Sequence, residues 1–367
     1  MRKIPIAYAI EGMFLGRTII DSEGHVMLRA GVCLDEYYIK RLYEIGVNYV
    51  YIVDPDFEDI EGEDIISEET RITTVKLVKQ SFNNLQQDRK LNTGALRKVV
   101  NNILDEILDN NNVLMTISDI ATLDNVIFYH MVSVCTLSIM TGITLGYNDT
   151  RLKELGIGAL LHDIGKSKID TDIVKRVGNL TEEEYAELCR HPELGFQIVK
   201  QYADISLLSA HVAYQHHERW DGKGYPRQLA GSDIHEYARI VAVANTYDNL
   251  MTDRPNRPPY QVNQAIKLLK HMSGIYFDPR IVTAVVANIA TYPIGSFIKL
   301  NTGEIGIVSQ NNPLNPQRPV IRIVVDNLMR RVKQPYEIDL SQMTTIIPVE
   351  ILSERELSQL LPRTPGS

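Results

Sequence analysis

Residues 154–169 read ELGIGALLHDIGKSKI, an apolar run that ends in a histidine followed by an aspartate. The run has helical spacing, and we expect its helix to continue into His162 and Asp163 and to stop at Gly165. A lone histidine in such a helix is more often a satisfied core residue. Two adjoining polar groups at the end of a buried apolar run, however, must be paired or must bind something. Imidazole and carboxylate groups are ligands of first-row divalent metals, so this pair predicts a metal site.

The chain around this pair is predicted to be helical from about residue 70 to residue 291. Thr181 begins a capping box, and Asp278, which precedes a proline, has the pattern of another helix start. His130 lies on an earlier helix over residues 123–140, which we expect to be amphipathic and to turn His130 into the bundle core. Helical bundles build metal sites from inward residues on facing helices. His130 is therefore a further candidate ligand.

A smaller module precedes the helical region. Residues 12–53 predict an α/β unit, in which two short β runs are joined by a turn over residues 21–24. A helix over residues 35–46 follows, with Gly46 at its C-terminal cap, and then another strand. Residues 54–69 are acidic and fit a solvated linker. We interpret residues 1–69 as a sensor, docking or dimerisation module with an acidic linker.

After Pro293 the pattern changes to short β runs, and residues 293–367 predict a small β module with a polar tail. The central domain then spans residues 70–292, and the fold class is mainly α with a small module at each end. The formal charge is −8, from 38 Lys and Arg against 46 Asp and Glu, which argues against a general DNA or RNA binder. Three scattered cysteines and no long uninterrupted apolar run favour a reduced, cytoplasmic protein without a membrane span.

Four motifs occur in a fixed order: HDIGK at 162–166, HPELG at 191–195, HHERWDGKGYP at 216–226 and ARIVAVANTYDNLMTDRP at 238–255. In order and spacing they resemble HD-GYP domains, a subclass of the HD-superfamily metal-dependent phosphohydrolases, over roughly residues 95–292. The resemblance implies an HD-type helical bundle in a bacterial enzyme that hydrolyses cyclic di-GMP to pGpG or GMP. It also implies a cluster of two or three iron or manganese ions, although nickel and zinc are compatible with such ligands.

The resemblance carries six metal ligands to this chain, with Asp163 bridging two ions. Neighbouring helix positions diverge by about 100°, which lets His162 hold one ion while Asp163 reaches another. Lys166 matches the family lysine after the HD pair, and a continuing helical turn would place it over the site to hold a phosphate oxygen or the leaving group. The six implied ligands are His130, His162, Asp163, His191, His216 and His217.

The resemblance also implies a substrate-binding set. Arg254 and Arg257 match basic positions expected to clamp ligand phosphate, although loop solvation explains them equally well. Gly222, Gly224 and Tyr225 belong to the GYP loop, for which a structural turn and ligand contact are equally favoured.

Two departures from the family pattern matter. Asn245 stands where the family usually has a ligand Asp, and an amide oxygen without charge is a weaker ligand. Asp248, three residues on, can compensate in part, although its family counterpart more often supports the site. Val126 stands where three-metal members have Glu. We therefore expect two ions, one of them held less firmly.

The favoured hypothesis is a two-metal phosphodiesterase in which a metal-bridging hydroxide attacks the phosphorus of cyclic di-GMP. A second hypothesis is an inactive receptor or scaffold, weakened by Asn245, that binds cyclic di-GMP or a GGDEF-domain partner. A third is an HD hydrolase that acts on another phosphorylated substrate, such as a different cyclic dinucleotide. The helical stretch before His130 is compatible with a homodimer.

Overall fold

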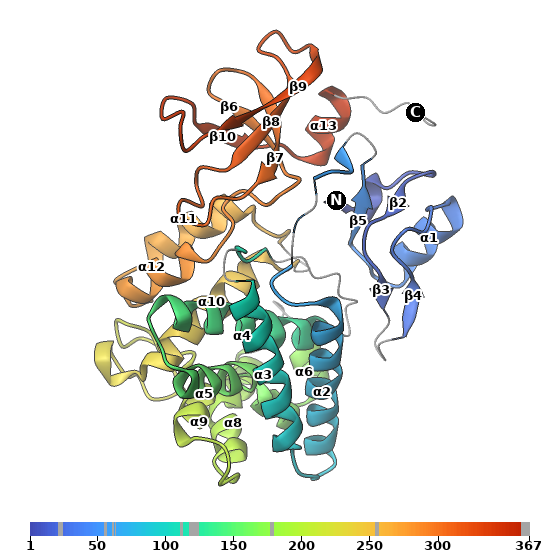
Figure 1. Cartoon of the computed structure of the whole chain (residues 1–367). Helices are drawn as coiled ribbons and strands as arrows, with labels where there is room; N and C mark the ends of the chain where they lie inside the picture. Colours follow the sequence, from blue (N-terminus) through green and yellow to red (C-terminus); the bar gives the residue numbers. More distant parts are fainter. Residues whose placement is uncertain are drawn as a thin grey trace. The chain divides into compact units, whose positions relative to one another are not determined.

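The computed structural model describes residues 1–20, 25–54, 57–60, 62, 64–110, 113–116, 125–176, 180–253 and 257–360. The chain forms two compact units (Figure 1). The helical unit comprises Ile65–Asn111 and Ile127–Ile289, and the β-rich unit comprises Met1–Asp64, Asn112–Val126 and Ala290–Ser367.

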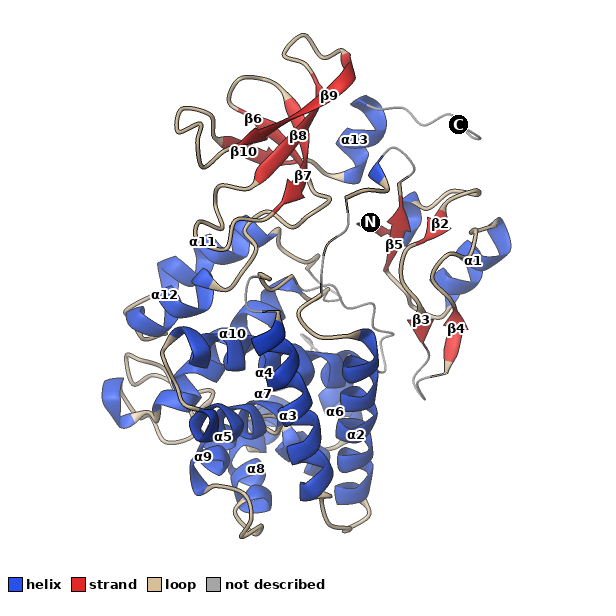
Figure 2. Cartoon of the chain, in the orientation of Figure 1, coloured by secondary structure: helices blue, strands red, loops and turns tan. Residues whose placement is uncertain are grey.

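The helical unit confirms the predicted helical region (Figure 2). Polar N-caps start most of its helices. Thr181 forms the predicted capping box with Glu184, and the Asp278 side chain accepts from the backbone N–H of Arg280. Its helices are α2 (Glu68–Gln86), α3 (Thr93–Asp109), α4 (Val126–Thr144), α5 (Asp149–Leu160), α6 (Thr171–Lys175), α7 (Glu182–Leu188), α8 (His191–Val199), α9 (Leu207–Gln215), α10 (Glu236–Met251), α11 (Val262–Met272) and α12 (Pro279–Ala287).

The α4 helix, which carries His130, is buried on all sides rather than amphipathic as expected. Its serine and threonine hydroxyls do not mark a solvent face, because Thr136 and Thr141 each donate to the backbone carbonyl four residues earlier. α4 is long and apolar enough to cross a membrane by length and composition alone. However, 83% of its most apolar stretch is buried inside the protein, as in the core helix of a soluble fold.

The turn that carries the HD pair differs from the predicted helix. α5 ends at Leu160, so His162 and Asp163 lie in a turn, and a 3₁₀ helix follows over Ile164–Lys168. A Cβ atom on Gly165 would lie only 2.0 Å from the carbonyl oxygen of His191. Gly165 therefore does not simply stop a helix; it lets this tighter turn pass against the first turn of α8.

The β-rich unit contains antiparallel sheets. In the N-terminal part, β5 (Tyr49–Val53) pairs with β1 and β2, and the predicted hairpin is formed by β3 and β4. Its turn at residues 21–24 lies outside the described residues. The predicted helix is α1, capped by Asp35, and Gly46 follows it with φ of 84°. The remaining bounds here are β1 (Arg2–Pro5), β2 (Phe14–Leu15), β3 (Ile19–Ile20), β4 (Val26–Leu28) and α1 (Glu36–Glu44).

The C-terminal part is a five-stranded sheet in the order β10-β6-β7-β8-β9. Four strands match the predicted β runs. Sequence patterns did not reveal β9, because it is an exposed edge strand with a proline in its middle, or the final helix α13. The bounds are β6 (Phe297–Leu300), β7 (Ile305–Gln310), β8 (Val320–Val325), β9 (Arg331–Asp339), β10 (Pro348–Ile351) and α13 (Glu354–Leu360).

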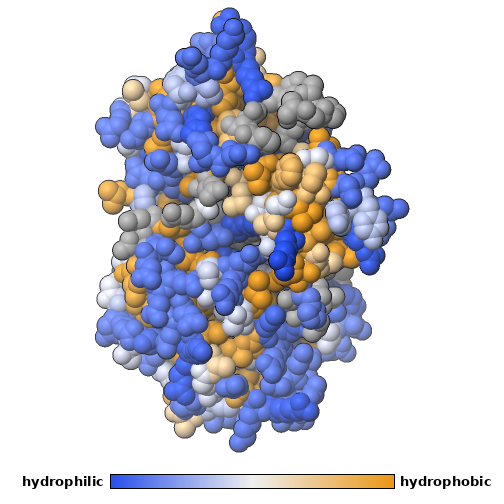
Figure 3. Space-filling model, turned by 45° about the vertical axis from the view of Figure 1, so that its right-hand side comes forward, coloured by the Kyte–Doolittle hydropathy of each residue, from blue (hydrophilic) through white to orange (hydrophobic). Residues whose placement is uncertain are grey.

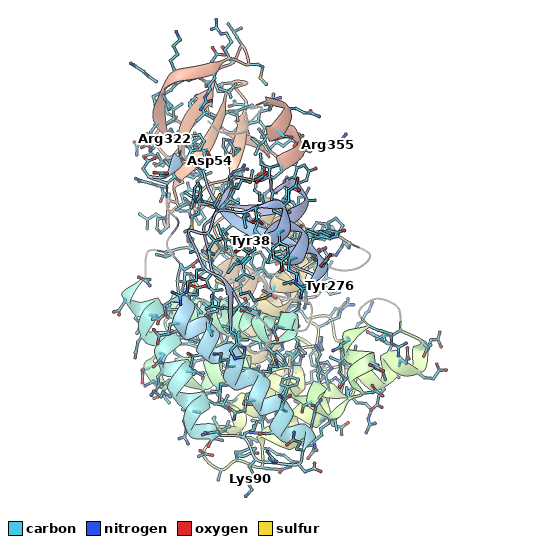
Figure 4. The ribbon with its side chains drawn as sticks, turned by 90° about the vertical axis from the view of Figure 1, so that its right-hand side faces the viewer. Tyr38, Asp54, Lys90, Tyr276, Arg322 and Arg355 are labelled. Carbon is cyan, nitrogen blue, oxygen red and sulfur yellow. The ribbon has the colours of Figure 1, made fainter. Side chains whose placement is uncertain are left out.

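The two ends of the chain share a core within the β-rich unit. Phe57 and Ile60 lie in the stretch expected to be a solvated linker, yet both are buried and pack with Phe297 and other residues of the C-terminal sheet. Asp59 forms an ion pair with Arg322 of β8. Figure 4 labels the Arg322 side chain. The acidic stretch thus alternates buried apolar residues with surface carboxylates, a pattern that its overall charge concealed.

The N-terminal part of the β-rich unit also exposes large apolar side chains (Figure 3). Tyr37 and Tyr43 on α1 are 71% and 66% exposed, and Phe14 on β2 is 47% exposed. A sensor, docking or dimerisation role for this module stays a prediction.

Candidate metal centre

The structure brings together the six predicted ligands, all of which lie at or near helix ends. They form two groups whose ligand atoms lie within 4.8 Å of one another, and Asp163 belongs to both. His130 comes from α4, and His162 and Asp163 follow α5, while the other three come from the start of α8 and the end of α9. One group is Asp163, His191, His216 and His217, and the other is His130, His162 and Asp163.

Three of the imidazoles are oriented by their own backbone. In each, Nδ1 donates to the carbonyl oxygen three residues earlier, at 2.7 Å for His162 and His191 and at 3.0 Å for His216. A carbonyl oxygen only accepts hydrogen bonds, so Nδ1 must carry the proton. The Nε2 atoms therefore present lone pairs to the interior of the cluster, which is the arrangement that metal-ligating histidines need.

His130 is oriented by a carboxylate instead. Its Nδ1 lies 2.5 Å from Oδ2 of Asp248 on α10, and its Nε2 lies 3.9 Å from Oδ2 of Asp163. Both residues of the Asp248–His130 pair are buried. The structure thus gives Asp248 a supporting contact with a candidate ligand.

Replacing Asp248 by Ala is expected to weaken metal binding by about 10- to 100-fold, because His130 loses the acceptor that fixes its ring. Metal titration of the purified variant, followed by calorimetry, measures this change. The matched control is Asp233→Ala, which removes an exposed carboxylate from a 3₁₀ helix before α10. Equal affinity in Asp248→Ala and the native chain would show that His130 needs no such support.

Burial sets the charge of the cluster. It lowers the pKa of His162 and His217 well below the ordinary value, and it lowers the pKa of His191 to about 4, so these rings are neutral at pH 7. Burial would raise the pKa of Asp163, but the positive charge of Lys166 helps to hold it well below its usual range. The cluster therefore combines neutral nitrogen donors with one ionised carboxylate.

The cluster has more hydrogen-bond acceptors than donors, and this excess of lone pairs suits the binding of divalent cations. Nε2 of His162 and Oδ1 of Asp163 are buried without a hydrogen-bond partner. Nε2 of His191 lies 3.3 Å from Oδ1 of Asp163 and also 3.3 Å from Nε2 of His216. Lone pairs that face one another at these distances repel unless a cation lies among them. The donor set of imidazole nitrogens and a shared carboxylate suits iron, manganese, nickel or zinc.

Asn245 lies on α10 one turn before Asp248 and is buried. Its side-chain oxygen accepts a hydrogen bond of 2.7 Å from Nδ2 of Asn249. The atom that would have to bind a metal is thus already hydrogen-bonded to a neighbour. This contact adds to the weakness that the uncharged amide brings.

The GYP loop is fixed to the cluster through His217. The Tyr225 ring stacks on the His217 ring, with centroids 4.7 Å apart and 13° between the planes. The backbone N–H of Tyr225 donates to the carbonyl oxygen of His217, and a Cβ atom on Gly224 would lie 2.5 Å from that same oxygen. Gly222 has a φ of 75°. Both glycines are therefore required by the turn, and Tyr225 packs on a candidate ligand.

Glu218 holds this loop and was missed by sequence reasoning. Its buried carboxylate accepts the backbone N–H groups of Arg227 at 2.7 Å and Leu229 at 3.0 Å. An acid directly after two histidines is the sequence signal that could have marked it.

Replacing Glu218 by Gln is expected to lower the free energy of unfolding by about 2 kcal/mol, because one backbone N–H would face an amide NH₂ instead of an oxygen. Urea unfolding measures the loss. Glu58→Gln, at an exposed position, is the control and should change stability little. Equal stability of both variants would contradict a role for Glu218 in holding the loop.

Arg254 and Arg257 are the predicted phosphate clamp, and the structure gives Arg257 contacts within the protein itself. Arg257 donates to the carbonyl oxygens of Leu250 and Asn249 at the end of α10, and it lies over the Tyr260 ring. Arg254 lies outside the described residues. A phosphate-binding role for either arginine stays a prediction.

Two parts of the chain match known protein families. Residues 115–281 match the HD domain family, and residues 297–360 match a KOW domain associated with the HD domain. A cyclic di-GMP phosphodiesterase of Pseudomonas aeruginosa is 31% identical over 67% of this chain and 59% of its own length. One from Thermotoga maritima is 35% identical over 49% of this chain and 48% of its own length.

A third relative, a 3'3'-cGAMP-specific phosphodiesterase of Vibrio cholerae, is 35% identical over 33% of this chain and 24% of its own length. The chain thus spans less than two thirds of each of these relatives. The region that matches the HD domain family contains all six clustered ligands, and it ends within α12. This chain belongs to the HD domain family, in its HD-GYP subclass.

Proposed function

We propose that this chain is a metal-dependent phosphodiesterase that hydrolyses cyclic di-GMP to pGpG, to GMP or to both. The observation that carries the proposal is the buried carboxylate of Asp163, which is shared by two groups of histidine ring nitrogens. Two relatives are named as cyclic di-GMP phosphodiesterases, which supports the substrate. Each hydrolysis adds one water, breaks one P–O3′ bond and leaves a free 3′-hydroxyl.

Six residues would hold two divalent ions, with Asp163 shared between them. Such ions, when bound, neutralise phosphate charge and make water a nucleophile near pH 7. The ammonium of Lys166 contacts Asp163 and its side chain is 20% exposed, so it can donate to a phosphate oxygen or to the leaving O3′. The backbone-bound Nδ1 atoms keep the imidazoles fixed, and Tyr225 shields one face of His217 from water.

Anaerobic turnover of cyclic di-GMP by protein reconstituted with Fe(II) or Mn(II) tests the proposal, with the metal content counted on the same sample. Release of pGpG or GMP at about two ions per chain supports it. Fully loaded protein that hydrolyses 3′3′-cGAMP but not cyclic di-GMP would support a related cyclic dinucleotide as substrate.

The receptor hypothesis has one observation in its favour, the hydrogen bond that engages the oxygen of Asn245. Protein that binds cyclic di-GMP without turnover, at one ion or fewer per chain, would support a receptor. A GGDEF-domain partner and a homodimer stay predictions that size-exclusion and pull-down measurements can test.

A further inference from the structure

The carboxylate of Asp163 has one donor among the described residues, the ammonium of Lys166. Nζ lies 2.5 Å from Oδ2 of Asp163. The other side chains around the carboxylate approach it with Nε2 atoms at 3.3 to 3.9 Å, and in three of them the proton is on Nδ1. These imidazoles are those of His130, His162, His191 and His216. The ammonium is thus the group that balances the buried charge.

Lys166 also differs from Asp163 in its access to solvent. Its side chain is 20% exposed, whereas that of Asp163 is 2% exposed. It belongs to the 3₁₀ helix Ile164–Lys168, and its ammonium lies at the end of a flexible four-carbon stem. The ammonium can therefore leave Asp163 by rotation of the stem, without unfolding of the turn.

A divalent ion in this cluster competes with the ammonium for the same atom. Oδ2 of Asp163 is 3.5 Å from Nε2 of His162 and 3.9 Å from Nε2 of His130, so an ion bound by these nitrogens also takes that oxygen. Two cations on one oxygen in a buried site repel each other strongly, because little solvent screens them.

We propose that Lys166 is an exchangeable counter-cation. It neutralises Asp163 in the metal-free protein, and metal binding displaces its ammonium toward solvent. The freed ammonium then faces the side from which a phosphate must enter, a last step that rests on the proposed function. Lys166 is in this way the counter-cation of the metal-free site as well as a candidate phosphate donor.

Competitive acetylation of lysines in the native chain, with and without Mn(II), tests the exchange. Mass spectrometry compares Lys166 with Lys168, whose ammonium donates to the Leu85 carbonyl and to Asp88, away from the cluster. We expect Mn(II) to raise the acetylation rate of Lys166 severalfold and to leave that of Lys168 unchanged. Unchanged or slower acetylation of Lys166 at full metal occupancy would overturn the proposal.

The variant Lys166→Met gives a second test, in which thermal stability and Mn(II) affinity should change in opposite directions. Lys166→Met should lower the thermal stability of the metal-free protein, because Asp163 loses its counter-charge, and should bind Mn(II) more tightly. A structural role alone would lower both quantities. Lys168→Met is the matched control and should leave Mn(II) affinity unchanged. Equal or weaker Mn(II) binding by Lys166→Met would overturn the exchange.

The outcomes separate this proposal from the proposed function. Native protein that binds no Mn(II) would overturn the metal centre and the exchange together. Protein that shows the exchange but hydrolyses no cyclic dinucleotide would count against the phosphodiesterase alone.

Discussion

Replacing Asp163 by Asn is expected to reduce bound metal to background and to slow cyclic di-GMP hydrolysis by about 10³-fold or more. Asp163 is the residue common to both groups of converging ligand atoms. An amide keeps the size of the side chain, but it removes the negative charge and replaces one ligand oxygen by an NH₂ group. The remaining imidazoles cannot hold two dications side by side without that charge.

The measurement is metal content by elemental analysis together with turnover on the same sample. Asp172→Asn is the control, because it makes the same change at an exposed position in the first turn of α6. Circular dichroism should show the native helical content in both variants, since Lys166 reaches solvent and is not trapped beside the new amide. Full metal loading of Asp163→Asn would contradict a bridging role for Asp163.

The candidate ligands could be proposed from the sequence because several of their signals are local. His162 with Asp163, and His216 with His217, are adjacent in the sequence, and each pair follows the end of an apolar helix. Helix starts could also be predicted from the sequence, because a cap such as that of Thr181 is formed within four residues. The turn after Leu160 could not be predicted from the sequence, since it depends on how closely Gly165 approaches α8.

The partners of the supporting residues could not be predicted, because these contacts join distant parts of the chain. Asp248 orients His130 across 118 residues, and a sequence pattern gives no distance between them. The same limit applies to α4: periodicity shows that a helix is apolar, but only its neighbours decide that all its sides are covered. Local motifs therefore supply the candidate ligands, and contacts between distant parts of the chain complete the geometry of the site.

Replacing Asn245 by Asp is expected to tighten binding of the second ion by about 10- to 100-fold, because added ligand charge raises metal affinity. Asp also removes the competition with Asn249, since a carboxylate has a second oxygen free to bind. Turnover should rise in parallel if the native site is only partly loaded. Titration with Mn(II), counted by elemental analysis, separates tighter binding from faster chemistry.

The matched control is Asn148→Asp, which makes the same change at the exposed N-cap of α5, where Asp serves as well as Asn. A second variant, Asn249→Ser, frees the oxygen of Asn245 without adding charge, so it should tighten metal binding in the same direction but less. Unchanged metal content in Asn245→Asp would show that the second ion does not depend on this position. Turnover that arises only in Asn245→Asp would make the native chain a receptor, because a single amide would then separate binding of the dinucleotide from its hydrolysis.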